Sequence, residues 1–191
     1  MFTYVYIIPS FDNCIIDKYA DDTVLTGLIT EDNYSAYTQE VVAFVKWCED
    51  NYLVLNVEKT KEMVIDFRKA RDNPENIRIQ DKTVERVSHF KYLGVILDNK
   101  LSWNQNTENI VKKLKPRMYC LRKLKSFNVN QQLLQMFYTS MITSVLTFGV
   151  SCWGGNIGKH DQNRINKIIV CSNNEKILFD ALSAIRPFLN I

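Results

Sequence analysis

The spacing of apolar residues changes near Trp103, and this change constrains the fold of the 191-residue chain more than any other feature. Before Trp103, short apolar runs are separated by polar turns, a pattern typical of strands. After it, apolar residues recur every three or four positions, as they do along one side of a helix. The sequence therefore predicts an α+β region up to about Trp103, followed by an all-α region.

The α+β region begins with a predicted β-hairpin over residues 13–29, with Ala20, Asp21 and Asp22 at or near its turn. A helix is expected over residues 30–51, followed by short strands at 53–55 and 62–67 and a charged loop at 68–75. The candidate N-caps of that helix are Thr30, Asp32 and Asn33, and its predicted buried face consists of Tyr34, Tyr37, Val41, Phe44, Val45 and Cys48. More strands are expected over 77–98, where Gly94 indicates a bulge or the close approach of another backbone.

Two helices are predicted after Trp103. Pro116 should kink the first or begin it afresh, and Asn130 should cap the second, which Gly149 ends. The predicted buried faces are Ile110, Leu114, Leu121 and Leu124 in the first helix, and Leu133, Leu134, Phe137, Met141, Ile142 and Val145 in the second. Residues 154–160 (GGNIGKH) are expected to form a loop.

Charge is distributed unevenly along the chain. Residues 1–100 contain 12 Lys/Arg against 17 Asp/Glu, a net of −5, whereas residues 101–191 contain 12 against 4, a net of +8. An acidic half followed by a basic half indicates a metal or acid-chemistry site beside a surface that binds a polyanion. The alternative is an ordinary distribution of solvated charges.

The cysteines and the N-terminus indicate an intracellular protein. Wide spacing argues against both a zinc module and a disulfide framework, so reduced, mostly buried thiols are expected at Cys14, Cys48, Cys120, Cys152 and Cys171. The apolar start, MFTYVYII, lacks a basic n-region and is too short to span a bilayer. We therefore expect no targeting signal and no membrane partner, and none of these features specifies an oligomeric state.

Paired carboxylates at the hairpin are the strongest candidate for chemistry. Asp21 and Asp22 would project oxygen ligands into a narrow space, where Mg²⁺ binds well. Nucleotide addition uses two such ions about 3.5–4 Å apart. Adjacent aspartates are also common in turns for structural reasons, so the pair alone is weak evidence.

Three segments together give a specific resemblance. Residues 19–25 (YADDTVL) resemble the third catalytic motif of reverse transcriptases, and a predicted helix follows at the expected distance. Residues 51–61 (NYLVLNVEKTK) are similar to the fourth motif of the non-LTR, LINE-type group. Residues 90–98 (FKYLGVILD), with Trp103 after them, are similar to the hairpin that grips the primer. The resemblance to non-LTR retrotransposon reverse transcriptases extends over residues 17–169.

The resemblance implies a role for each motif residue. In the family, the first aspartate of the third motif binds both Mg²⁺ ions and the second supports the site. The resemblance gives these roles to Asp21 and Asp22, respectively. Tyr19 would pack near the primer terminus, and Lys59 would lie near the triphosphate, where a cation stabilises the leaving pyrophosphate. A solvated loop lysine is the alternative for Lys59.

The primer-grip turn would consist of Tyr92, Leu93 and Gly94. Core packing is a compatible alternative for Tyr92 and Leu93. The implied partners are an RNA template and a DNA primer, paired as an RNA–DNA hybrid.

The resemblance also implies a partial enzyme. Only eighteen residues precede Tyr19, too few for the family's fingers, its nucleotide-selecting helix and the strand that carries another metal-binding aspartate. The upstream carboxylates, Asp12 and Asp17, do not match that first motif. We expect a fragment of an RNA-directed DNA polymerase that is inactive alone: a partial palm with the primer-grip hairpin (1–103), a thumb-like helical region (104–169) and an unassigned tail (170–191).

A basic stretch follows the palm-like region. It has seven cations and no acid: Lys112, Lys113, Lys115, Arg117, Arg122, Lys123 and Lys125. In the family this segment is the first thumb helix, which lies along the template–primer duplex. Cations on a helix bind phosphates without reading sequence. A solvated helix face is the alternative.

Other functional classes remain open at this point. The chain could be a non-catalytic nucleic-acid-binding module, or a relic without function. Residues 112–153 also weakly resemble an N-terminal helical segment of AlkB-homologue tRNA methyltransferases. An iron dioxygenase needs two histidines and a carboxylate around one metal, and the chain has only His89 and His160, with no HxD pair.

Overall fold

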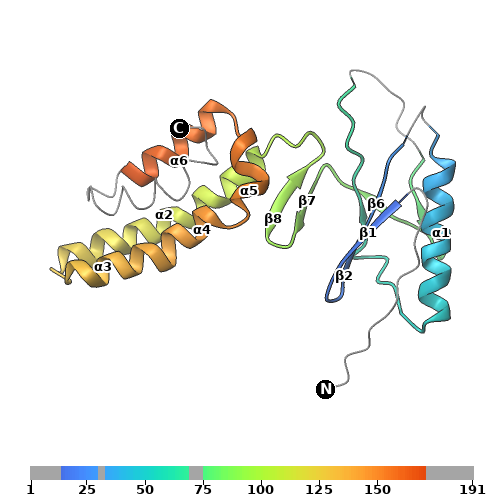
Figure 1. Ribbon diagram of the computed structural model, residues 1–191, viewed down its shortest axis with the longest axis horizontal. Helices are drawn as coiled ribbons and strands as arrows, with labels where there is room; N and C mark the ends of the chain where they lie inside the picture. Colours follow the sequence, from blue (N-terminus) through green and yellow to red (C-terminus); the bar gives the residue numbers. More distant parts are fainter. Residues whose placement is uncertain (1–13, 30–32, 69–74, 171–191) are drawn as a thin grey trace. The chain divides into compact units, whose positions relative to one another are not determined.

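The computed structural model describes residues 14–29, 33–68 and 75–170. These residues form two compact units (Figure 1). The first unit comprises 14–29, 33–62, 68 and 75–87, and the second comprises 63–67 and 88–170.

The first unit begins with the predicted hairpin. β1 (Cys14–Tyr19) pairs antiparallel with β2 (Asp22–Gly27), and residues 20 and 21 form the turn. A Cβ atom at Gly27 would lie 2.5 Å from Cδ2 of Tyr37, too close for any larger residue. The face with Cys14 and Leu25 packs inward, and the opposite face stays open to solvent.

Helix α1 (Ser35–Asp50) confirms the predicted helix with a later start. The N-cap position is Tyr34 and not one of the expected residues, although Asn33 just before it accepts a hydrogen bond of 3.1 Å from the Ser35 N–H through its Oδ1. The other two candidate caps lie outside the described residues. Val41 and Cys48 are buried as predicted, and the core of this unit consists of Val41, Val57, Ile79 and Val84.

The strand predicted at 53–55 is wrong, and the one at 62–67 is reduced to β3 (Lys61–Glu62), which pairs in parallel with β6 (Glu85–Arg86). The end of α1 explains the first error. Tyr52 has a left-handed φ of 56°, and the N–H groups of Tyr52 and Leu53 donate to the carbonyls of Glu49 and Cys48. This hydrogen-bonding pattern closes the helix with a Schellman motif, so the segment is not available to pair as a strand.

Short strands do form over 77–98, as predicted. β4 (Arg78–Ile79) and β5 (Lys82–Thr83) make a small antiparallel hairpin in the first unit. In the second unit β7 (His89–Tyr92) pairs with β8 (Val95–Asp98). Gly94 therefore lies in a turn and not inside a strand, and the group that approaches it is a side chain: a Cβ atom there would lie 2.9 Å from Cε1 of Phe148.

Helix α2 (Asn104–Ser126) runs through Pro116, which the sequence had predicted to kink or restart it. A proline inside a helix costs about 3 kcal/mol. The buried stripe offsets this cost because it continues on both sides of the proline, with Ile110 and Leu114 before it and Met118 and Leu121 after it.

The second predicted helix is divided into α3 (Gln131–Phe137), the π-helix η1 (Tyr138–Thr143) and α4 (Ser144–Thr147). Asn130 caps it as predicted, with its side chain accepting from the Gln132 N–H at 2.8 Å. Leu134 and Ile142 are buried, but Leu133 and Met141 are exposed, which corrects the predicted face. The buried positions recur every four residues, at Leu134, Tyr138, Ile142 and Leu146, and Leu133 and Met141 lie beside this stripe.

Three short elements complete the second unit: α5 (Val150–Trp153), the 3-10 turn η2 (Gly154–Asn156) and α6 (Lys159–Val170). Gly149 ends the preceding helix as predicted, and the predicted loop at 154–160 is partly helical. α2 lies alongside α3 to α4, and α6 packs against α2 (Figure 1). Among the described residues no single helix is long and apolar enough to cross a membrane; α3 to α4 with α5 to η2 would qualify only as a pair bent by 43°.

The described cysteines are all free thiols, as expected. Cys14 and Cys48 are buried, and burial raises the pKa of both thiols. Cys120 and Cys152 are exposed, which corrects the expectation of mostly buried thiols; Cys171 lies outside the described residues.

Candidate metal-binding turn and nucleic-acid interface

The YADD tetrad forms the tip of the β1–β2 hairpin. Tyr19 pairs with Asp22 across the strands, and residues 20 and 21 make the turn between them. Ala20 has a φ of 54°, a left-handed conformation that side chains other than glycine rarely adopt. Asp21 and Asp22 are exposed, and Tyr19 is 65% exposed. The hairpin turn lies where the sequence predicted it, but both carboxylates face solvent and not the narrow space that was expected.

The strand register adds a third carboxylate to the open face. Asp17 lies opposite Val24 and therefore shares a face with Tyr19 and Asp22, as a diagonal neighbour of Asp22. Within the described part of the chain, no group of three or more His, Cys, Asp or Glu side chains converges to hold a metal ion. The exposed turn alone therefore supplies too few ligands for a two-ion Mg²⁺ centre.

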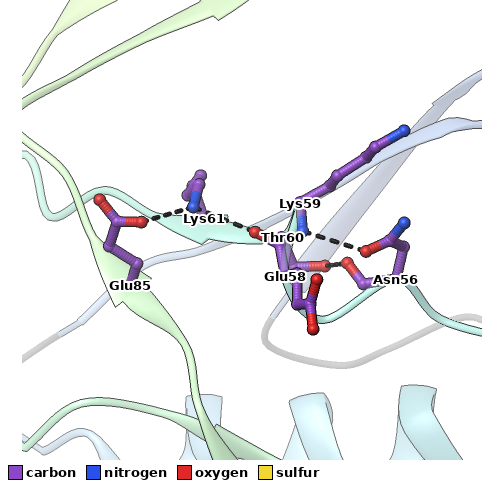
Figure 2. A network of polar contacts seen from close by, with 6 residues as sticks. All are labelled: Asn56, Glu58, Lys59, Thr60, Lys61 and Glu85. Atoms are coloured by element: carbon purple, nitrogen blue, oxygen red, sulfur yellow. Dashed lines mark hydrogen bonds and ion pairs between the residues drawn. The ribbon is translucent and has the colours of Figure 1, made fainter.

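Lys59 lies on a separate turn of the first unit, built by Asn56 (Figure 2). Asn56 Oδ1 accepts from the Lys59 N–H at 3.2 Å, and its carbonyl accepts from the Thr60 hydroxyl at 2.9 Å. Lys61 is paired with Glu85, while the Lys59 side chain extends away from this network. The fourth-motif segment therefore presents its lysine outward, although the lysine does not share an element with the carboxylate turn.

The predicted primer-grip turn belongs to the second unit. Leu93 and Gly94 both have positive φ values, 45° and 91°, which matches a tight two-residue hairpin turn. Leu93 is 42% exposed, and Tyr92 is half-buried. Asn106 of α2 holds the hairpin in place, because its Oδ1 accepts from the Ile96 N–H at 3.2 Å.

Asp98 fixes the connection between this hairpin and α2, a role that was not predicted. Its buried carboxylate accepts hydrogen bonds of 3.0–3.1 Å from the N–H groups of Lys100, Ser102 and Trp103, and from the Ser102 hydroxyl. Burial pushes the pKa of Asp98 upward, but these hydrogen bonds outweigh burial and leave the pKa lowered. The sequence did carry a signal, since an Asp with a Ser four residues later, just before a helix, is typical of local capping.

The cations of α2 divide between its two sides. Residues three or four apart lie on the same side of a helix, which groups Lys112, Lys115, Arg122 and Lys123, all exposed. Lys113, also exposed, and Arg117 lie away from that group, and Arg117 contacts η1. Lys125, also exposed, lies in the last helical turn, where a cation favours the helix dipole.

Two of these cations already have partners. Arg117 is half-buried, and its Nη1 donates to the carbonyl of Met141 in the π-helix. Lys112 pairs with Glu108 at 3.0 Å, and this hydrogen bond lowers the pKa of the Glu108 carboxyl. A phosphate would have to compete for both side chains, whereas Lys113, Lys115, Arg122, Lys123 and Lys125 are exposed.

Comparison with known proteins finds a weak similarity over most of this chain. The chain is 23% identical over 155 residues to a probable RNA-directed DNA polymerase from transposon BS of Drosophila melanogaster, a match that covers 79% of this chain and 17% of that relative. This chain is similar to a transposon polymerase. The similarity supports a relationship to reverse transcriptases, as the motifs had suggested, and the chain spans only a small part of the relative.

A shorter similarity falls on the helices. Residues 103–144 match the model of the family described as "Alkylated DNA repair protein alkB homolog 8, N-terminal". The matched residues include all of α2, α3 and η1, with neither His89 nor His160 among them. No solved structure matches the chain.

Proposed function

We propose that this chain is part of the RNA-directed DNA polymerase of a non-LTR retrotransposon, and that its own contribution is to bind the template–primer. The cationic outer side of α2 carries the proposal, since Lys115, Arg122 and Lys123 are exposed in a stretch without acids. Cations arranged in this way neutralise phosphates without reading sequence. The similarity to a transposon polymerase over 79% of the chain supports the same function.

The motif residues have proposed roles within that polymerase. Asp21 and Asp22 would contribute ligands to Mg²⁺, Tyr19 would lie near the primer terminus, and Lys59 would face the triphosphate. These assignments rest on the match to the family's motifs and on the exposure of the four side chains. Two carboxylates on one exposed turn leave most of the coordination shell to water, so we expect weak Mg²⁺ binding and no templated synthesis by this chain alone.

The hairpin turn of Tyr92, Leu93 and Gly94 would contact the primer. Two sets of hydrogen bonds support this assignment. Asn106 and Asp98 fix the hairpin to the start of α2, the helix that carries the cations. A contact made by the turn and a contact made by the helix would therefore keep a constant spacing, as recognition of a regular RNA–DNA hybrid requires. The same geometry would serve a binding module without catalysis.

The AlkB-type similarity does not favour a dioxygenase. Oxidative demethylation needs an iron site with two histidines and a carboxylate, and the matched residues 103–144 include no histidine. The AlkB-type similarity covers the same helices as the main proposal, and one of them, α2, is strongly basic.

The proposal is tested by fluorescence anisotropy with a labelled RNA–DNA hybrid at several KCl concentrations. Binding should weaken steeply with salt, with a log–log slope of about −0.9 per phosphate contacted. Replacing the outer-side cations Lys112, Lys115, Arg122 and Lys123 with Ala should flatten the slope by up to about 3–4. Sequence changes in the hybrid should have little effect.

The matched control removes the same charge elsewhere, by replacing the exposed lysines Lys46, Lys100, Lys159 and Lys167 with Ala. This variant should bind with nearly the wild-type slope, because its cations lie outside the proposed interface. Equal flattening in both variants would mean that net charge alone attracts the hybrid. No binding by the wild-type chain at low salt would refute the proposal outright.

A further inference from the structure

An exposed tyrosine lies in the middle of the cationic side of α2. Tyr119 is 56% exposed, four residues after Lys115 and three before Arg122, with Lys123 four residues after it. Residues at these spacings are neighbours on a helix surface, so the phenol ring is bordered by cations toward both ends of the helix. On the side of α2 that carries Arg117, the guanidinium is already hydrogen-bonded to a carbonyl of η1.

The fold does not need this ring for packing. The buried stripe of α2 is formed by other residues, including Leu114, Met118 and Leu121, and Tyr119 is not part of the core that they make. An exposed aromatic residue gains little stability from the folded state, and alanine has a higher helix propensity. The ring is therefore available for a ligand.

Charge and chemistry limit the kinds of partner that fit. Between Lys112 and Lys125 the chain has seven cations and no acid, so the partner is a polyanion. A regular duplex covers the faces of its bases by stacking, and an aromatic ring beside it meets only the backbone and the grooves. An unpaired base has a free face, and stacking on an aromatic side chain flanked by cations is how proteins bind single strands without sequence preference.

We propose that Tyr119 is a stacking platform for an unpaired base, and that the side of α2 formed by Lys115, Tyr119, Arg122 and Lys123 binds a single strand or the single-stranded end of a template–primer. This inference rests on the proposed function, which it deepens by naming the form of nucleic acid that the helix prefers. Phosphates on either side of the stacked base would contact Lys115 and Arg122, and the ring between them would hold the base.

The test uses the full chain and three labelled probes of equal length: a single strand, an abasic single strand with the same phosphates, and a blunt RNA–DNA hybrid. Tyr119→Ala should weaken binding of the ordinary single strand by about fivefold to a hundredfold, the loss of one base–aromatic stack. Its affinity for the abasic strand and for the blunt hybrid should stay at the wild-type value. Tyr119→Phe keeps the ring and should bind as the wild type does.

The contacts of Lys115 and Arg122 with phosphates are tested separately, through the salt dependence of binding. Replacing both Lys115 and Arg122 with Ala should reduce the salt slope for the single strand by about 1.4, at 0.7 per phosphate contact. Tyr119→Ala should leave that slope unchanged. The matched control is Tyr52→Ala, which removes a 95% exposed ring from the first unit and should alter no affinity.

Each outcome bears on one claim. If the wild-type chain binds single strands but Tyr119→Ala binds them equally well, the stacking platform is wrong and the cationic interface stands. If Tyr119→Ala weakens the abasic strand as much as the ordinary one, the ring acts on the helix or its charges, and stacking is again excluded. If the wild-type chain binds none of the three probes, the proposed function fails first.

Discussion

The two units carry different chemistry and are packed to different degrees. The first unit bears the carboxylate turn, and among its described residues the buried cluster is small: Val41, Val57, Ile79 and Val84, with Cys14 and Cys48 also buried. The second unit bears the cations and has a continuous core that reaches from Trp103 to Ile169, with fully buried Leu114, Ile142, Trp153 and Ile165. The candidate metal-binding carboxylates therefore lie on the unit with the smaller core. The candidate phosphate-binding cations of α2 lie on the unit with the larger core.

This difference indicates what each unit can do independently. Isolated two-stranded hairpins are marginally stable in water, and β1–β2 is held mainly by one face against α1. The same unit exposes Leu28, Tyr52 and Val54 almost completely. The helical unit, by contrast, positions α2 against α3 to α4 and α6, so its cationic side is presented by a rigid support.

Within the second unit, two adjacent leucines of α3 differ greatly in burial. The sequence had predicted both on one buried face. Leu134 is 4% exposed and Leu133 is 56% exposed. Leu134→Ala should lower the free energy of unfolding of the helical unit by about 2–5 kcal/mol. Leu133→Ala, its matched control, should change it by less than about 0.5 kcal/mol. Urea unfolding followed by far-UV circular dichroism measures both, and similar losses would show that the described face of α3 is wrong.

The next largest effect is expected at Asp98, where the hairpin joins α2. Asp98→Asn should destabilise the helical unit by about 2–3 kcal/mol at pH 7, because the amide cannot accept all four hydrogen bonds and loses the charge that strengthens them. Glu108→Gln is the control, since it removes only an exposed ion pair within one helix and should change the stability much less than Asp98→Asn does.

Acid should abolish the difference between wild type and Asp98→Asn. The folded-state pKa of Asp98 is lowered, so its carboxylate stabilises the unit above the unfolded pKa of about 3.9. That contribution is lost as the pH falls through the folded-state value. Urea unfolding at pH 7 and at several lower pH values should therefore show the two proteins converging. A gap that stays constant down to the acid limit would mean that Asp98 acts through packing and not through its charge.

The sequence predicted the elements whose signals are local. The alternating hairpin, the side-chain cap at Asn130 and the left-handed end at Gly149 depend on neighbouring residues, and each appears where it was expected. The errors involve tertiary effects. Packing carries α2 through Pro116, and the buried stripe of the second helix is narrower than predicted, which leaves Leu133 and Met141 exposed.

The candidate site was predictable to a similar extent. The sequence identified the cations of α2 and the aspartates of the turn, because residue type and order suffice for that. It could not divide the cations between two helix sides without knowing which side is buried, and so it grouped Arg117 with Lys115 and overlooked Tyr119. Burial of Leu114 and Met118 supplies the missing orientation.

The smallest expected effect concerns strain at the carboxylate turn, in the less well-packed unit. Ala20 has a φ of 54°, where a side chain is disfavoured and glycine is not. Ala20→Gly should therefore stabilise the β1–β2 hairpin by about 0.4–1 kcal/mol, in spite of the greater freedom that glycine gives the unfolded chain. The control is the same substitution at the exposed helical position Ala43, which should destabilise α1 by up to about 1 kcal/mol. Native-state hydrogen exchange of the β1, β2 and α1 amides resolves both changes without involving the helical unit. If Ala20→Gly loses stability as Ala43→Gly does, then the left-handed turn is not the solution conformation, and the assignment of Asp21 and Asp22 to an exposed hairpin tip would have to be abandoned.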